Sequence, residues 1–266
     1  YVGLYRYIQC FVVSNGVDTK YFANSDKDIL YSLTFFWTDE NNIRITNLKE
    51  FSIAFFAKDQ LTRLLTRYTV LNDSEKAIMI MRPYQVYAAS RLIDRALFSD
   101  KNAYVWHTTG SGKTLTSFKV AQVLAKESRI KKVIFLVDRK DLDSQTMEEF
   151  NKFEQGSVDV TDNTGILVNQ MKKKDVHLIV TTIQKMANAV KNPRYAAVMD
   201  AYKDEKVVFI VDECHRSQFG DMHMDIVRHF HKAQFFGFTG TPRFDINGKK
   251  EGHVVMTTAA LFGECV

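Results

Sequence analysis

The 266-residue sequence predicts an α/β protein in which a parallel β-sheet is flanked by helices and preceded by a small β-rich and helical segment. Three observations predict this fold class. From residue 84 onward, short apolar runs alternate with stretches of helical period. These apolar runs lack alternating polar residues, as expected of parallel strands that are buried on both faces. One run leads directly into a glycine-rich loop that is followed by a helical pattern.

The expected elements of this region alternate in order along the chain. The predicted strands are 103–106, 132–137, 177–180, 207–211 and 234–238, and the predicted helices are 85–97, 114–125, 141–153, 183–190 and 221–229. Residues 154–176 show no clear period and are predicted to be irregular.

The first 48 residues favour β-structure. Their β-branched and aromatic residues predict strands at 8–13, 20–23 and 33–37, and Ser14-Asn15-Gly16 predicts a turn between the first two. Residues 49–69 then place their apolar side chains on one broad helical face. The polar stretch 71–75 marks a predicted boundary between a domain at 1–72 and a second domain at 73–266.

The composition limits the class of protein. Hydrophobic residues make up 45% and charged residues 25% of the chain, which is typical of a globular domain with a full core. Cysteines at positions 10, 214 and 265 have neither metal-site nor disulfide spacing, so we predict a cytoplasmic protein. No apolar run approaches ~18 residues, so no membrane association is expected. The net charge of +5 is too mild to indicate a partner.

The glycine-rich loop runs from His107 to Thr114 and reads His-Thr-Thr-Gly-Ser-Gly-Lys-Thr. Glycines allow backbone N–H groups to turn toward phosphate oxygens, and the following helix adds its positive end. Lys113 would reach the β- and γ-phosphates, and Thr114 would offer its hydroxyl to Mg²⁺. We therefore predict an ATP- and Mg²⁺-binding loop with contacts from Thr109, Gly110, Ser111, Gly112, Lys113 and Thr114.

Two carboxylates, Asp212 and Glu213, follow the apolar strand 207–211. The carboxyl end of a buried parallel strand lies at the sheet edge where ligands bind. Asp212 would hold Mg²⁺ through a water, and Glu213 would orient the water that attacks the γ-phosphate. The alternative is a solvated acidic pair that caps the next helix.

Three further residues belong to this edge of the predicted sheet. We expect His215 to hydrogen-bond the loop after the last strand, where Thr239 and Thr241 supply two hydroxyls. A metal site at Cys214 and His215 is not favoured, because no second Cys or His stands at ligand spacing.

Taken in order, these motifs resemble those of superfamily 2 helicases and translocases. A narrower resemblance, to the R subunit of type I restriction enzymes, rests on Met81-Arg-Pro-Tyr-Gln85, the loop with His at its first position, Val137-Asp-Arg-Lys-Asp-Leu142 with Gln145, and Phe238-Thr-Gly-Thr-Pro-Arg243. Leu4-Tyr-Arg-Tyr-Ile-Gln9 and Phe11-Val-Val-Ser-Asn-Gly16 also resemble the end of that family's nuclease domain. The resemblance implies that 1–72 is the end of a nuclease domain with a linker helix, and that 73–266 is the first RecA-like motor domain.

The resemblance also implies roles for single residues. Gln85 would recognise adenine with Arg82 nearby, and Lys113, Asp212 and Glu213 would be catalytic. Residues that would touch the DNA backbone are Arg139, Thr181 and Thr182. For Arg139 the alternative is a solvated loop, and for the two threonines it is a helix N-cap.

For the whole protein, the resemblance implies ATP-dependent translocation of double-stranded DNA before cleavage. The implied partners are DNA and the methyltransferase and specificity subunits.

Asp18 and Lys20 have the spacing of a nuclease motif, but we interpret them as residues of the predicted hairpin. We expect the sequence to be a piece of a longer protein. A second motor domain would supply an arginine finger, so we expect residues 1–266 alone to bind Mg-ATP weakly and scarcely hydrolyse it. Another DNA or RNA helicase, or a nucleotide-gated binding module without turnover, remain the alternatives.

Overall fold

The computed structural model describes residues 3–25, 31–72, 77–108, 110–137, 163–212, 219–244, 249–251 and 254–266. The chain forms two compact units, residues 1–89 and 90–266, and each is described by itself. The division falls inside α3 (Pro83–Phe98), later than the predicted boundary at 72/73. That predicted boundary separates two strands that pair with each other, β5 (Thr69–Asn72) and β6 (Ala77–Ile80), since Asn72 lies opposite Ala77. The assignment of 1–72 to a nuclease domain stays a prediction.

The first unit begins with a 3₁₀ helix, η1 (Gly3–Tyr7), and the predicted hairpin. Strands β1 (Cys10–Ser14) and β2 (Thr19–Ala23) are antiparallel, and the turn between them contains Gly16 at φ +92°. The Asn15 side chain accepts hydrogen bonds from the amides of Val17 and Asp18, at 3.0 and 2.7 Å. Asp18 is therefore a turn residue, as the hairpin interpretation expects.

Two expectations for the first unit were wrong. A strand at 33–37 was predicted, but this stretch follows η2 (Tyr31–Leu33) and touches β2 through one isolated bridge before the short pair β3 (Trp37–Thr38) and β4 (Arg44–Ile45). The single helix at 49–69 is two helices, α1 (Leu48–Phe55) and α2 (Lys58–Thr66). The helix is broken at Ala57, whose ψ of 127° is extended. Apolar residues continue in the sequence on both sides of this break, so their pattern did not reveal it.

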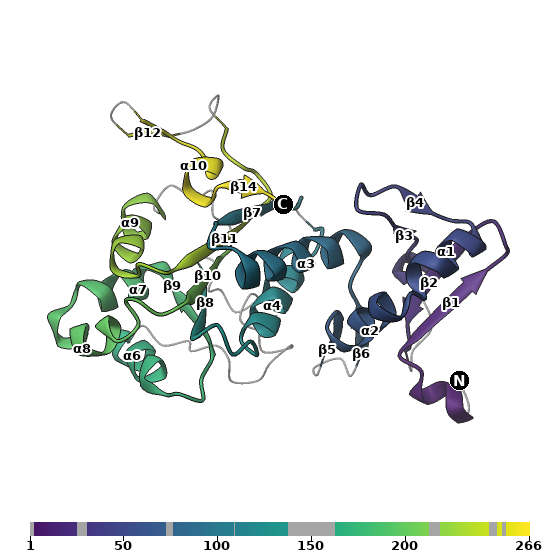
Figure 1. The fold of residues 1–266 in the computed structure, drawn as a ribbon, viewed down its shortest axis with the longest axis horizontal. Coiled ribbons are helices and arrows are strands. Elements are labelled where there is room, and N and C mark those ends of the chain that lie inside the picture. The colour runs from purple at the N-terminus through teal and green to yellow at the C-terminus, as the bar shows by residue number, and fades with distance from the viewer. Residues whose placement is uncertain are drawn as a thin grey trace. The chain divides into compact units, whose positions relative to one another are not determined.

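The second unit is built on a parallel sheet, which confirms the predicted fold class (Figure 1). Within the described residues the strand order is β14-β7-β11-β10-β8-β9, with all neighbours parallel. The strands are β7 (Ala103–Trp106), β8 (Lys132–Val137), β9 (Leu178–Thr182), β10 (Val207–Val211), β11 (Gln234–Thr239) and β14 (Glu264–Cys265). Every residue of β8, β10 and β11 is buried, as the apolar runs that make up most of these strands predict.

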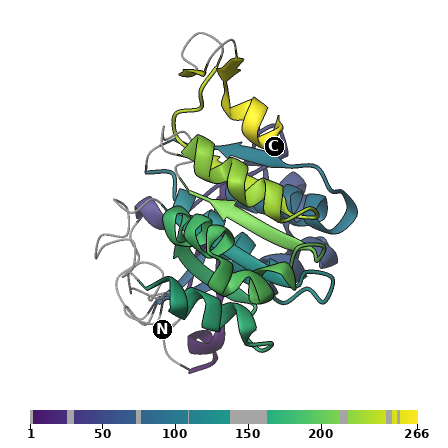
Figure 2. The ribbon, with the colours of Figure 1, turned by 90° about the vertical axis from the view of Figure 1, so that its left-hand side faces the viewer.

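Helices cover both faces of this sheet. Helix α4 (Lys113–Leu124) lies on one face, and α6 (Thr164–Lys172), α7 (Ile183–Lys191) and α9 (Phe219–His229) lie on the other (Figures 1 and 2). The smaller elements of the unit are η3 (Pro193–Tyr195), α8 (Ala196–Asp200), the hairpin β12 (Lys249–Glu251) with β13 (Val254–Met256), and α10 (Thr258–Phe262). Among the described residues, no helix combines the length and apolar character needed to cross a membrane.

The helix α6 corrects the expectation that 154–176 is irregular, as far as this stretch is described. Asn163 caps α6 by accepting from the Gly165 amide at 2.8 Å. Leu167, Val168 and Met171 are buried in the core of the second unit. The spacing of these three residues is helical, but the polar residues around them leave no clear apolar period in the sequence. The predicted helix 141–153 lies outside the described residues.

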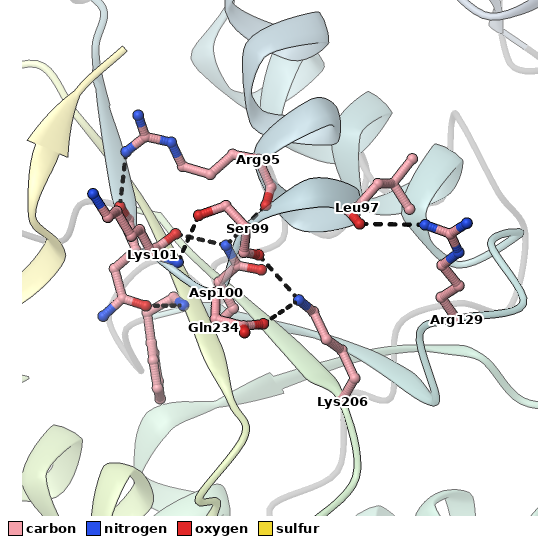
Figure 3. Close-up of polar contacts among 10 residues, drawn as sticks. Arg95, Leu97, Ser99, Asp100, Lys101, Arg129, Lys206 and Gln234 are labelled. Atoms are coloured by element: carbon pink, nitrogen blue, oxygen red, sulfur yellow. Dashed lines mark hydrogen bonds and ion pairs between the residues drawn. The ribbon is translucent and has the colours of Figure 1, made fainter.

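Side chains at the starts of the strands hold β7 in place (Figure 3). Gln234, the first residue of β11, donates from Nε2 to the carbonyls of Lys101 and Arg95, at 2.6 and 3.3 Å. Lys206 donates from Nζ to the carbonyl of Ser99 at 3.1 Å. These bonds fix the connection between α3 and β7, and β7 in turn positions the glycine-rich loop.

Candidate nucleotide-binding site

The glycine-rich loop connects the end of β7 to the start of α4. Gly110 and Gly112 adopt positive φ angles of +78° and +81°. The Ser111 amide and hydroxyl both donate to the carbonyl of Thr108, at 3.2 and 2.6 Å, which closes a tight turn between the glycines. Gly112 is the N-cap of α4 and supplies no side chain to the helix N-terminus. Left-handed turn residues followed by a helix N-terminus form the backbone geometry that binds phosphate.

Lys113 and Thr114 are the first two residues of α4, and both are half-buried. This position places a cation and a hydroxyl directly after the left-handed turn. The donor set of backbone amides, one ammonium and one hydroxyl therefore fits a triphosphate with Mg²⁺. Thr109, the remaining predicted loop residue, lies outside the described residues.

His107 is buried, with 8% of its surface exposed, and its amide donates to the carbonyl of Thr239 at 3.0 Å. Burial and, to a smaller extent, the nearby charge of Lys113 lower the pKa of His107 to about 4. The imidazole is therefore neutral at pH 7, and the positive charge at this end of the loop belongs to Lys113.

The loop after β11 lies beside the glycine-rich loop. Thr239 is fully buried, and its hydroxyl accepts a hydrogen bond from the Thr241 amide at 3.1 Å. The Trp106 indole donates to the carbonyl of Gly240 at 3.2 Å. The two predicted threonines thus lie at the same sheet edge as the glycine-rich loop, with Thr241 exposed. Their coupling to His215 stays a prediction, because His215 lies outside the described residues.

Asp212 follows β10 at this edge. Its amide donates to the carbonyl of Leu136 on β8 at 3.2 Å, and its side chain is half-buried. Strand β11 lies between β7 and β10, so the Thr239 loop stands between the glycine-rich loop and Asp212. The structure therefore brings Lys113, Thr114 and Asp212 to one edge of the sheet. Glu213 lies outside the described residues.

Arg82 and Gln85, the predicted adenine-recognition residues, lie in the first unit at the start of α3. The Gln85 side-chain oxygen accepts from the Arg82 amide at 2.9 Å, and Gln85 is only 3% exposed. This bond is one half of a capping box, in which the side chain of a Gln at the third helical position accepts from the N-cap amide. Gln85 therefore has a structural role at the helix start, and its contact with adenine stays a prediction.

The residues predicted to contact DNA are only partly described. Thr181 and Thr182 end β9, and each is only 3% exposed. Thr182 is the N-cap of α7 and accepts from the Lys185 amide at 3.2 Å. Thr182 is therefore a helix N-cap, which was the alternative for the two threonines. The contact of either threonine with DNA stays a prediction. Arg139 lies outside the described residues.

Sequence reasoning missed the aromatic and hydrogen-bonded support of the Thr239 loop. Trp106 packs edge-to-face against Phe244 with ring centroids 5.8 Å apart. Arg243 and Thr258 exchange two hydrogen bonds, at 2.8 and 2.9 Å, and so tie the loop to α10. The sequence gives no local signal for these pairs, because 15 residues separate Arg243 from Thr258.

The chain is similar in sequence to known proteins. Residues 84–266 match the model of the SWI2/SNF2 ATPase family. The chain is 56% identical over 266 residues to the type I restriction enzyme SsaAORF53P endonuclease subunit of Staphylococcus saprophyticus, across 100% of this chain and 28% of that protein. It is 38% identical over 210 residues to a Mycoplasma pneumoniae protein described as the C-terminal part of the putative type I restriction enzyme MpnIIP endonuclease subunit, across 73% of this chain and 99% of that protein.

A solved structure shows the same fold. The UvsW helicase from bacteriophage T4 superposes with a TM-score of 0.51 at 15% identity, across 89% of this chain and 83% of that chain. At this identity the likeness concerns the fold alone, a parallel sheet flanked by helices. The chain spans 28% of the length of the S. saprophyticus relative.

Proposed function

Because this chain belongs to the family of type I restriction enzyme endonuclease subunits and carries a SWI2/SNF2 ATPase region, we propose that it binds ATP with Mg²⁺ to drive translocation of double-stranded DNA. The match to an ATPase family supports the use of a nucleotide. The identity of the metal, the DNA substrate and the cleavage that follows translocation are parts of the proposal.

One observation carries the proposal: the left-handed turn at Gly110 and Gly112 opens onto Lys113 at the sheet edge that also holds Asp212. Backbone amides of the turn would hold the phosphate oxygens, and the Lys113 ammonium would donate to the β- and γ-phosphates. Thr114 and Asp212 would hold Mg²⁺, which supplies charge neutralisation when bound. Glu213 would orient the attacking water, and Gln85 with Arg82 would recognise adenine.

The first test is nucleotide binding by the 266-residue chain. Lys113→Ala should weaken ATP affinity on the order of 100-fold, because charge-assisted hydrogen bonds contribute about 1.5–3 kcal/mol each and this ammonium makes more than one. Affinity is measured by isothermal titration calorimetry in the presence of Mg²⁺.

Lys126→Ala is the matched control. Lys126 is exposed and follows the C-terminal end of the same helix, so this variant removes the same charge about 20 Å away. ATP affinity that falls equally in both variants would indicate a general electrostatic effect and contradict a site at the loop. Repeating the titration with EDTA tests the metal, since Thr114 and Asp212 predict a weaker complex without Mg²⁺.

Translocation is tested with the whole protein and its proposed methyltransferase and specificity partners. ATP turnover should rise with the length of double-stranded DNA, and a third strand should be displaced from a distant triplex without separation of the duplex. Separation of the two duplex strands would favour the alternative of a helicase. Tight ATP binding that changes a partner's affinity, with turnover unaltered by Glu213→Gln, would favour a nucleotide-gated binding module.

A further inference from the structure

The first unit contains a buried aromatic cluster that is built from separate elements. Tyr21 on β2 lies 5.1 Å from Phe55 on α1 and 5.7 Å from Trp37 on β3, measured between ring centroids. Phe51 stacks on Phe55 at 4.7 Å. All four side chains are at most 1% exposed. The cluster is therefore the core of this unit, and residues attached to it have fixed positions.

This cluster holds the segment that enters α3. The Tyr21 hydroxyl donates to the Met81 carbonyl at 3.0 Å in a buried hydrogen bond. The Arg82 guanidinium lies over the Phe35 ring, 4.9 Å from its centroid. Tyr21 and Phe35 are themselves joined by two backbone hydrogen bonds of 2.9 Å each. One bridged pair of residues thus contacts two successive residues, 81 and 82.

A second contact fixes the first turns of the same helix. The Tyr87 hydroxyl donates to the Thr38 carbonyl at 2.9 Å, and its ring lies 6.0 Å from Trp37. Burial raises the pKa values of Tyr21 and Tyr87 above the ordinary phenol range, so both hydroxyls keep their protons as donors. Residues 81–87 are therefore held at both ends by one aromatic cluster.

Gln85 lies between these two contacts, and its side chain is oriented through Arg82. Its Oε1 accepts from the Arg82 amide, so the direction of the carboxamide depends on the backbone at residue 82. That backbone is set by the hydrogen bond to Met81 and by the cation–π contact of Arg82. A shift of residue 82 would rotate the Gln85 amide with it.

We propose that Tyr21 and Phe35 are positioning residues for base recognition: they fix Arg82 and Gln85 in the orientation that distinguishes adenine. The inference rests on the proposed function, in which Gln85 binds adenine and Lys113 binds phosphate. It gives the β-rich first unit a role in nucleotide selectivity, because its core determines where the base-recognising amide points.

The test compares ATP with inorganic tripolyphosphate, which lacks a base, in calorimetric titrations of the 266-residue chain. Tyr21→Phe removes one hydroxyl, and Phe35→Leu removes the ring beneath Arg82. Each variant should weaken ATP affinity about fivefold, the equivalent of about 1 kcal/mol for one buried hydrogen bond or cation–π contact, while tripolyphosphate affinity stays unchanged.

Tyr202→Phe is the matched control. The Tyr202 hydroxyl also donates to a buried backbone carbonyl, that of Met171, but in the second unit. This variant should change neither affinity. Thermal unfolding of each variant confirms that it is folded, and Tyr87→Phe replaces Tyr21→Phe if the latter unfolds.

Two outcomes would overturn the inference. Equal losses for ATP and tripolyphosphate would show a general loosening of the protein, and an unchanged ATP affinity in folded Tyr21→Phe and Phe35→Leu would show that the cluster does not position the base contact. Failure of the proposed function is distinguishable, because Lys113→Ala would then leave tripolyphosphate affinity unaltered or Gln85→Ala would leave ATP affinity unaltered.

Discussion

The two edges of the central sheet differ in how their side chains are used. At the amino edge, where the strands begin, Gln234, Lys206 and Lys132 donate hydrogen bonds to backbone carbonyls of neighbouring connections. At the carboxyl edge, where the strands end, the notable features are the left-handed glycines and the half-buried Lys113 and Asp212.

This difference separates stability from ligand binding. Side chains that satisfy buried carbonyls hold the strand starts in register, and their loss leaves polar groups unsatisfied. The carboxyl edge instead uses backbone conformation and charge, which are suited to a phosphate ligand. Variants at the amino edge should therefore change unfolding, and variants at the carboxyl edge should change nucleotide affinity.

The largest expected effect on stability is at Lys132. This residue begins β8, is 2% exposed, and donates from Nζ to the carbonyls of Lys173 and Val176 after α6. Lys132→Met keeps the apolar stem but removes the donor, so the free energy of unfolding should fall by about 3 kcal/mol. Chemical denaturation measures the change, and ATP affinity should remain within about twofold of the parent, because one full strand separates Lys132 from the carboxyl edge.

Lys131→Met provides the control for Lys132. Lys131 is the exposed neighbour, so the same substitution there should leave unfolding nearly unchanged. Similar losses in the two variants would contradict a specific role for the buried ammonium. A large loss of ATP affinity in a folded Lys132→Met protein would break the separation between the two edges.

A second prediction concerns acid sensitivity at the carboxyl edge. His107 has a folded-state pKa of about 4, below the unfolded value near 6.5, so the unfolded chain binds the proton first as pH falls. Above about pH 6.5 the ionisation of His107 does not affect stability. As the pH falls from 6.5 toward 4, protonation of this histidine in the unfolded chain lowers the free energy of unfolding. His107→Ala should therefore reduce the loss of unfolding free energy between pH 7.5 and 4.5 by about 2.5 kcal/mol.

The comparison of His107→Ala with the parent cancels the other titrating groups. His223, whose pKa burial also lowers to about 4, stays in both proteins and contributes equally. Denaturation curves at several pH values measure the difference. Parallel stability profiles for the parent and the variant would show that His107 is not buried in its neutral form.

Much of the second unit could be predicted from the sequence because its strands are buried on both faces. The limits of β7, β8 and β10 match the predicted ranges, since β7 and β10 are uninterrupted apolar runs and β8 is such a run after its first residue, Lys132. The positions of Lys113 and Asp212 could be predicted for the same reason: Asp212 directly follows β10, and Lys113 follows the glycine-rich loop that begins after β7.

Long-range contacts could not be predicted in this way. The Gln234 bonds reach residues more than 130 positions away, and the Tyr21 hydroxyl reaches Met81 across 60 positions. Apolar periodicity reports which face of an element is buried but not which partner it meets. The break between α1 and α2 could not be predicted for a similar reason, because an apolar period does not reveal a single extended residue such as Ala57.

The smallest expected effect on stability concerns Gly110, where backbone strain and phosphate binding can be measured separately. Gly110 and Gly16 both have positive φ, at +78° and +92°, and an added Cβ would meet no atom within 4 Å at either. Gly110→Ala and Gly16→Ala should therefore each lower the free energy of unfolding by about 1 kcal/mol through backbone strain alone. Only Gly110→Ala should also weaken tripolyphosphate binding, because the strain shifts the amides of the loop. An equal affinity for tripolyphosphate in the two variants, measured by calorimetry, would mean that the left-handed turn at Gly110 does not shape the phosphate site.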